Sequence, residues 1–198
     1  MIPISDDLLK RINRDLIEKC HRKVKVIETA HNGKGRGPGT IEFQTDHHCL
    51  SIRLPKDPVK WLQLQRCGDA AIFEFHADGV NLHIVEMKCK VNVGEWLKAK
   101  ERALGAYFNC LAIGKLLDIE EFSKITLHIA YIEDAVGETG TSAPSTLKTT
   151  IGGKAGSPHS TPVAEWITRN VKMPGLINCI PLRLVQRDAD GNGIGTLE

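Results

Sequence analysis

A β-hairpin predicted between Cys67 and Lys90 constrains the fold of this 198-residue chain more than any other stretch. Its two extended segments carry apolar residues such as Ile72 in the first and Ile84 in the second. They are joined by His76-Ala-Asp-Gly79, and an Asp-Gly pair between apolar runs is typical of a hairpin turn. The chain is therefore expected to build a β-sheet around this antiparallel pair.

Three charged residues fall at particular places in the hairpin. Glu86 and Lys88 are two positions apart, so on a strand they share one face and lie about 7 Å apart. Asp69 opens the first strand, and with the hairpin paired in register it lies beside them. Two carboxylates this close repel each other unless a cation lies between them, and their oxygens suit Mg²⁺ or Mn²⁺.

A lysine beside such a metal site can orient water and stabilise charge on a phosphate, so the group suits metal-assisted hydrolysis of a phosphodiester. The alternative is that Asp69 is a turn residue and that Glu86 and Lys88 form a surface salt bridge. The apolar neighbours in Val85-Glu-Met-Lys-Cys89 favour the functional interpretation, because unpaired charge inside an apolar strand is costly.

Asp69, then Glu86-Met-Lys88 after a hairpin, then a long predicted helix resembles the PD-(D/E)XK nuclease superfamily, which has the restriction-endonuclease-like fold. The resemblance covers roughly residues 5–132. It departs from the family pattern at Gly68, where the family name has proline.

The resemblance implies that Asp69 and Glu86 ligate Mg²⁺ or Mn²⁺, with the backbone carbonyl of Met87 as an additional oxygen ligand. It implies that Lys88 positions the attacking water and stabilises the transition state. A further acid from the N-terminal region is expected, and Glu28 and Glu42 remain open as candidates.

In the resembling family the helix after the hairpin often supplies a polar residue to the active site. Glu95 to Leu117 is predicted as this helix, with Lys98, Arg102, Gly105 and Asn109 on a narrow polar stripe. Lys100 lies within the apolar arc, and its ammonium is expected within about 6 Å of Asp69 or Glu86, where charge is available. Glu101 is the next candidate.

The resemblance implies a metal-dependent nuclease that acts on nucleic acid, with DNA favoured over RNA. The small size of the chain is compatible with partner subunits or a homo-oligomer, for example in a defence or repair system. The alternative is a catalytically inactive module on the same fold that binds nucleic acid or protein.

Charge is unevenly distributed, although the net charge is only +2. Nine basic and three acidic residues lie between Lys10 and Arg36, a patch that suits a polyanion or forms a solvated helix face. The six cysteines are scattered, and no apolar run approaches the length of about 20 residues that a membrane span needs. A cytoplasmic protein without a membrane partner is expected.

The fold class expected is α/β: a mixed central β-sheet flanked by helices on both faces, with a restriction-endonuclease-like core and a C-terminal helix–strand extension. Residues 1–186 are expected to form one domain with a mobile loop at 135–162, followed by a flexible tail at 187–198. The other expected elements are a helix from Ser5 to about 24–29, a glycine-rich loop at 31–39, strands at 40–43, 49–54, 125–132 and 177–185, and a helix at 163–171.

Overall fold

The computed structural model describes residues 4–28, 39–54, 67–136, 161–174 and 176–197. Its strands are β1 (Ile17–Ile27), β2 (Thr40–Arg53), β3 (Ala70–His76), β4 (Gly79–Val91), β5 (Lys124–Asp134), β6 (Asn170–Val171), β7 (Ile180–Gln186) and β8 (Asn192–Thr196). Its helices are α1 (Asp6–Leu9), the short 3₁₀ helix η1 (Arg14–Leu16), α2 (Val93–Leu116) and α4 (Pro162–Thr168). None of the helices in these described ranges is long and apolar enough to cross a membrane.

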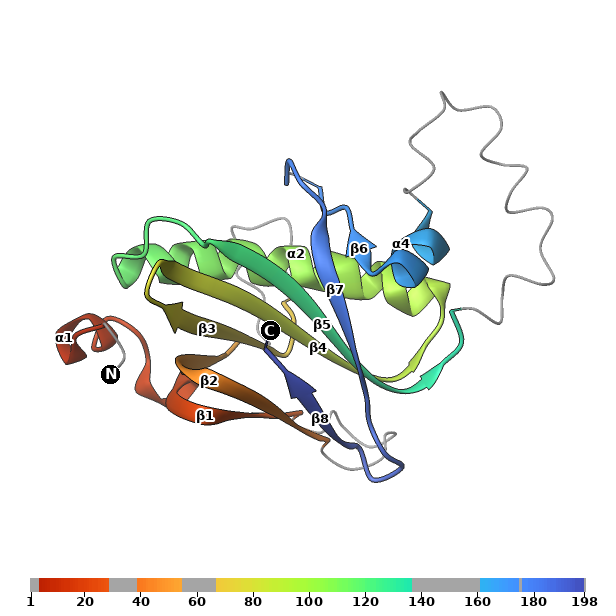
Figure 1. Cartoon of the computed structure of the whole chain (residues 1–198), viewed down its shortest axis with the longest axis horizontal. Helices are drawn as coiled ribbons and strands as arrows, with labels where there is room; N and C mark the ends of the chain where they lie inside the picture. Colours follow the sequence, from red (N-terminus) through yellow and green to blue (C-terminus); the bar gives the residue numbers. More distant parts are fainter. Residues whose placement is uncertain (1–3, 29–38, 55–66, 137–160, 175, 198) are drawn as a thin grey trace.

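These strands form one mixed sheet, which confirms the expected α/β class. Within the described residues the sheet has eight strands in the order β1-β2-β3-β4-β5-β7-β6, and β8 pairs with β2 (Figure 1). β4 and β5 are parallel neighbours, as are β5 and β7, whereas β1, β2, β3 and β4 are joined in antiparallel pairs.

The unit from β3 to β5 follows the sequence prediction. β3 and β4 pair from Ala70 opposite Val85 to His76 opposite Gly79. The side chain of Asn92 then accepts a hydrogen bond from the Glu95 backbone and caps α2 one residue after β4 ends. The helix carries the chain back so that β5 can pair parallel to β4, which is the usual way to join two parallel strands.

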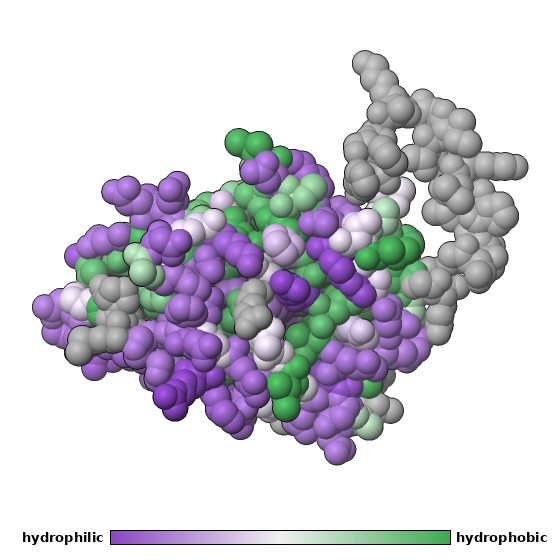
Figure 2. Space-filling model, in the orientation of Figure 1, coloured by the Kyte–Doolittle hydropathy of each residue, from purple (hydrophilic) through white to green (hydrophobic). Residues whose placement is uncertain are grey.

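The core has two parts, one on each face of the sheet. The larger part lies between the sheet and the helices and includes Trp96, Ala103 and Trp166. The smaller part includes Val24, Phe43, Met87 and Leu197, and it receives no helical residue. The expectation of helices on both faces is therefore wrong for the described residues, because strands β1, β2 and β8 close the second face (Figure 1). The face visible in Figure 2 is mainly hydrophilic, with hydrophobic residues in smaller groups.

The predicted N-terminal helix is also wrong beyond its first turn. Ser5 caps α1 as expected, but the helix ends at Leu9, and β1 begins at Ile17. In β1, buried Val24 and Val26 alternate with exposed residues, which is the period of a strand with one buried face. The two short strands expected at 40–43 and 49–54 are one continuous strand, β2. The predicted loops fall mostly on residues 29–38 and 137–160, which lie outside the described residues.

The C-terminal segment expected to be a flexible tail contains β8. Asn192 to Thr196 pair in parallel with Thr40 to Gln44 of β2. The next residue, Leu197, is 1% exposed and its backbone N–H donates to the carbonyl of Gln44. The segment therefore completes the smaller part of the core.

Leu197→Ala is expected to lower the free energy of unfolding by about 2–4 kcal/mol, because it removes a buried side chain from the second core. The matched control is Ile194→Ala on β8, whose side chain is 69% exposed, with an expected change of about 0.5 kcal/mol or less. Chemical denaturation of both variants measures the difference. Equal small losses would mean that this segment does not pack on the domain in solution.

Candidate active site

The three charged residues predicted to converge do lie together. Glu86 is 0% exposed on the face of β4 that α2 covers, and the Lys88 ammonium lies 2.8 Å from its Oε1. Asp69 precedes β3, and its Oδ2 accepts a hydrogen bond of 2.7 Å from the backbone N–H of Met87. The hairpin register thus brings two carboxylates and one amine to the end of β4.

Arg102 of α2 is a fourth member of the group. Its Nη1 donates to Glu86 Oε1 at 2.9 Å, so the same oxygen contacts both Lys88 and Arg102. The other oxygen, Oε2, is buried and has no hydrogen-bond partner among the described residues. A buried carboxylate oxygen without a partner is unfavourable, and it is available for a cation.

This arrangement disfavours the ionised form of both carboxyl groups and raises their pKa values. Burial and then the neighbouring charge of Asp69 raise the pKa of Glu86 to about 7, although Lys88 and Arg102 act in the opposite direction. Burial also raises the pKa of Asp69, and the hydrogen bond from Met87 opposes that rise. A divalent cation between the carboxylates would remove the mutual repulsion.

The backbone carbonyl of Met87 points to the same side of β4 as Asp69. β3 pairs with β4 only as far as Val85, so Met87 lies beyond the end of the ladder. The N–H and C=O of one strand residue point to the same neighbour, and the Met87 N–H points to Asp69. The Met87 carbonyl is therefore directed to the Asp69 side, as the predicted ligand set requires.

Lys100 does not join this group. Its ammonium lies 2.8 Å from both carboxylate oxygens of Glu165 on α4, so the predicted approach to Asp69 or Glu86 is wrong. Residues two apart on an α-helix are rotated by about 200°, so Lys100 and Arg102 point to nearly opposite sides. Arg102 of the polar stripe contacts the charged site, and the arc assigned to the core exposes Leu97 and Phe108. Glu101 is exposed.

Of the two open upstream acids, Glu28 is the one near the site. Its charge contributes to the raised pKa of Asp69, whereas Glu42 forms an ion pair with Lys23 on β1. Arg187 links Glu28 to β4: its Nη1 donates to Glu28 and its Nη2 donates to the carbonyl of Lys88. No pattern in the sequence indicated Arg187, because it lies 99 residues from Lys88 along the chain.

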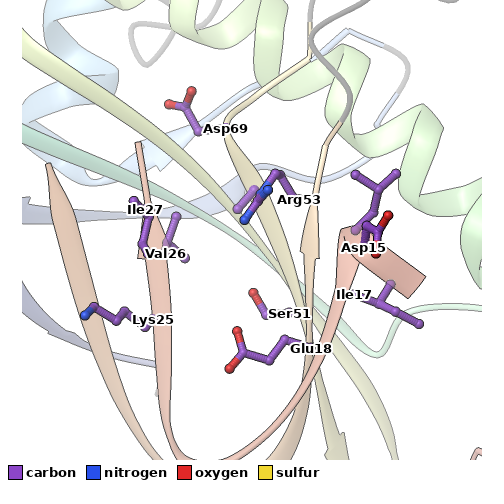
Figure 3. A pocket seen from close by; sticks show the side chains of 11 residues that line it. Asp15, Ile17, Glu18, Lys25, Val26, Ile27, Ser51, Arg53 and Asp69 are labelled. Carbon is purple, nitrogen blue, oxygen red and sulfur yellow. The ribbon is translucent and has the colours of Figure 1, made fainter. Parts of the chain in front are cut away.

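A pocket of about 300 Å³ opens beside Asp69 between the two ends of β1 (Figure 3). Lys25 of β1 and Arg53 of β2 line it, together with the acidic Asp15 and Glu18. Arg53 is opposite Ala70, the residue after Asp69, in the pairing of β2 with β3. Basic side chains beside the carboxylates offer contacts for a phosphate backbone.

The basic N-terminal patch is not one helix face. Lys10 follows α1, Arg14 lies in η1, and Arg22 and Lys25 lie on β1. Of these four residues, Lys25 alone lines the pocket beside Asp69, and Arg22 lines a different pocket. The continuous phosphate-binding face expected from a helix therefore does not form.

The described residues contain no group of three His, Cys, Asp or Glu side chains suited to hold a metal ion. The site at Asp69 instead offers two carboxylates and a carbonyl, a set that leaves the remaining positions of a Mg²⁺ ion to water and substrate. Comparison of the chain with protein-family models, with curated proteins and with solved structures found no match.

The raised pKa of Glu86 makes the stability of the metal-free protein depend on pH. The folded state holds this proton up to a pH of about 7, whereas the ordinary value is 4.5. The stability contribution is therefore full below pH 4.5 and is lost as the pH rises to about 7. Melting temperatures in EDTA should fall over this window in the wild type and fall less in Glu86→Gln. Parallel curves for the two proteins would contradict the raised pKa.

Proposed function

We propose that the protein is a metal-dependent nuclease that hydrolyses phosphodiester bonds, with DNA favoured over RNA. The observation that carries the proposal is the fully buried Glu86 carboxylate beside Asp69, with one oxygen unpartnered among the described residues. Buried titratable groups with strongly shifted pKa values gather at functional sites. The order of Asp69, hairpin, Glu86-Met-Lys88, helix and parallel strand also agrees with the PD-(D/E)XK resemblance.

Asp69, Glu86 and the Met87 carbonyl would hold Mg²⁺ or Mn²⁺. The unpartnered Glu86 Oε2 and the raised pKa values of both carboxyls fit such an ion, because its charge offsets the cost of two buried anions. The bound ion would lower the pKa of a coordinated water and polarise the phosphate.

Lys88 has the reach to act on the water and the phosphate. Its side chain is only 11% exposed. The Lys88 ammonium lies 2.8 Å from Oε1 of Glu86 and 3.8 Å from Oε2 of Glu95. In hydrolysis the water oxygen loses a proton and bonds to phosphorus, the bond from phosphorus to the leaving oxygen breaks, and the leaving oxygen receives a proton. The Lys88 ammonium would orient the water and stabilise the charge that develops on the phosphate.

Arg102 is a positioning residue in this proposal. Its guanidinium and the Lys88 ammonium share Glu86 Oε1, which fixes the carboxylate and directs Oε2 away from both cations. Arg53 and Lys25 would contact the phosphates that flank the scissile bond. Partner subunits or a homo-oligomer would extend this short basic surface.

A catalytically inactive module that binds nucleic acid or protein is the second candidate. It is favoured by the two cations on Glu86, which already balance the two carboxylates without a metal. Titration calorimetry with MnCl₂ separates the two candidates, because the nuclease is expected to bind Mn²⁺ and the inactive module is not.

Glu86→Gln is expected to abolish Mn²⁺ binding and to reduce cleavage of a plasmid or oligonucleotide by roughly 100-fold or more. Asp69→Asn and Lys88→Met should reduce cleavage similarly, and Lys88→Met should leave metal binding in place. The matched control is Glu165→Gln, which alters another buried carboxylate in an ion pair, remote from the metal ligands. Full cleavage by Glu86→Gln in the presence of metal would end the nuclease assignment.

Arg102→Met and Lys100→Met form a pair that separates positioning from packing. Arg102→Met is expected to lower the cleavage rate by about 10-fold or more, because Glu86 loses the partner that orients it. Lys100→Met should leave the rate near that of the wild type and lower the melting temperature, since Glu165 is buried and loses its ion pair. Cleavage rates and thermal denaturation of the two variants test this, and the reverse order of rates would restore the role first assigned to Lys100.

A further inference from the structure

A second pocket lies at the other end of β4, where Asn81 points to the face of the strand opposite to Glu86. Its volume is about 580 Å³, and Asn81 at the start of β4 lines it. Asn81 is five residues from Glu86 along the strand, roughly 17 Å at the rise of a β-strand. The pocket is in the size range of small-molecule sites and shares no lining residue with the pocket beside Asp69.

A hydrogen-bonded network of buried polar side chains ends at this pocket. Glu74 of β3, with a side chain 4% exposed, has Oε2 at 2.7 Å from His76 Nε2 and at 3.3 Å from His83 Nε2. Its Oε1 accepts a hydrogen bond of 2.5 Å from Thr45. Behind it, His83 Nδ1 lies 3.1 Å from Nε2 of the fully buried His128. Such a connected set holds each ring in one orientation.

The protonation state of Glu74 determines the direction of the hydrogen bonds that it makes in this network. Burial raises the pKa of Glu74, but hydrogen bonds from His83, Thr45 and His76 outweigh it and lower the pKa to about 2. A carboxylate only accepts, so His83 carries a proton on Nε2. Nε2 of His76 contacts both Oε2 of Glu74 at 2.7 Å and Nδ2 of Asn81 at 2.9 Å, and these two contacts fix the ring. The remaining ring nitrogen of His76, Nδ1, has no hydrogen-bond partner among the described residues, and the residue lines the pocket.

Two cations reach the same pocket from other strands. Arg22 lies at an irregularity in the pairing of β1 with β2, with a φ of 67°, and such a bulge re-aims a side chain. Lys124 opens β5 directly opposite Asn81 in the strand register. The third basic residue, Lys23, is paired with Glu42.

The acidic residues of the pocket are not paired with these cations. Glu74 keeps its negative charge, but its side chain is 4% exposed and its oxygens are held by Thr45, His76 and His83. Within the described residues, Arg22 and Lys124 form no ion pair with Glu74 or with Asp46. The ring of His47 lies beside that of His76, with centroids 3.9 Å apart, and adds aromatic surface. The pocket therefore combines two cations that are not ion-paired in the described part of the chain, an imidazole held by a buried carboxylate and an aromatic wall.

We propose that this pocket binds a phosphate ester of nucleotide size, with Arg22 and Lys124 on the phosphate. Glu74 holds the His76 ring in place, and this ring and that of His47 form the aromatic wall beside the ligand. Recognition here does not require the metal site, and it stands whether or not the protein cleaves nucleic acid.

Titration calorimetry with AMP in buffer containing EDTA tests the proposal on the full chain. Arg22→Gln and Lys124→Met are each expected to weaken binding about 10-fold, and both side chains are exposed, so the fold should persist. Adenosine should not bind, because it lacks the phosphate. The Nδ1 resonance of His76 in a ¹⁵N-labelled sample should shift on addition of AMP.

Lys19→Gln is the matched control, because it removes a cation from the same strand as Arg22 but lines neither this pocket nor the pocket beside Asp69. It should leave AMP binding unchanged. Absence of binding at ~10 mM AMP, equal binding of adenosine, or loss of binding in Lys19→Gln alone would each overturn the proposal. Tighter binding of an oligothymidylate without terminal phosphates than of AMP would support the pocket and identify the ester as part of a nucleic-acid strand.

Discussion

Glu86 is a carboxylate placed in the core of the protein, and the surrounding structure depends on how its charge is balanced. Burying an unpaired charge costs several kcal/mol, so cations must reach it from elements that are fixed in position. Lys88 reaches it from the same strand, and Arg102 reaches it from α2. The cap at Asn92 starts the helix one residue after β4, which sets where Arg102 lies along the strand. The rotation of α2 is thus tied to the charge as well as to its apolar packing.

The elements that sequence reasoning predicted correctly are those whose signals are local. The Asp-Gly turn identified the hairpin, and a long apolar pattern with a narrow polar stripe identified α2. β1 was missed because Leu8, Ile12 and Leu16 recur at helical spacing up to the point where the strand begins. Only Val24 and Val26 show the alternation of a strand, and they are buried in a cluster whose other members, such as Met87 and Leu197, are remote in sequence. Such tertiary pairing is invisible to a pattern of local spacing.

The site residues also divide into those with a local sequence signal and those positioned by remote parts of the chain. Strand alternation and hairpin register were sufficient to bring Asp69, Glu86 and Lys88 together. The helical wheel of α2 separated Arg102 from the apolar arc, but hydrophobicity did not tell which face was buried: the helix exposes Leu97 and Leu116 and turns Arg102 inward. Lys100 was misplaced for this reason, since its partner Glu165 lies 65 residues away on α4. The choice of Glu28 over Glu42 likewise required the pairing of β1 with β2.

Two buried carboxylates of the same hairpin, Glu74 and Glu86, are stabilised in opposite ways. Glu74 accepts hydrogen bonds from three side chains, and its pKa falls to about 2 despite burial. Glu86 faces the carboxyl group of Asp69 and keeps one oxygen unpartnered within the described part of the chain, and its pKa rises to about 7. Only Glu86 therefore gains from an added cation, because the charge of Glu74 is already satisfied by donors. This contrast supports the proposed metal site at the end of β4 beside Asp69 over one at Glu74.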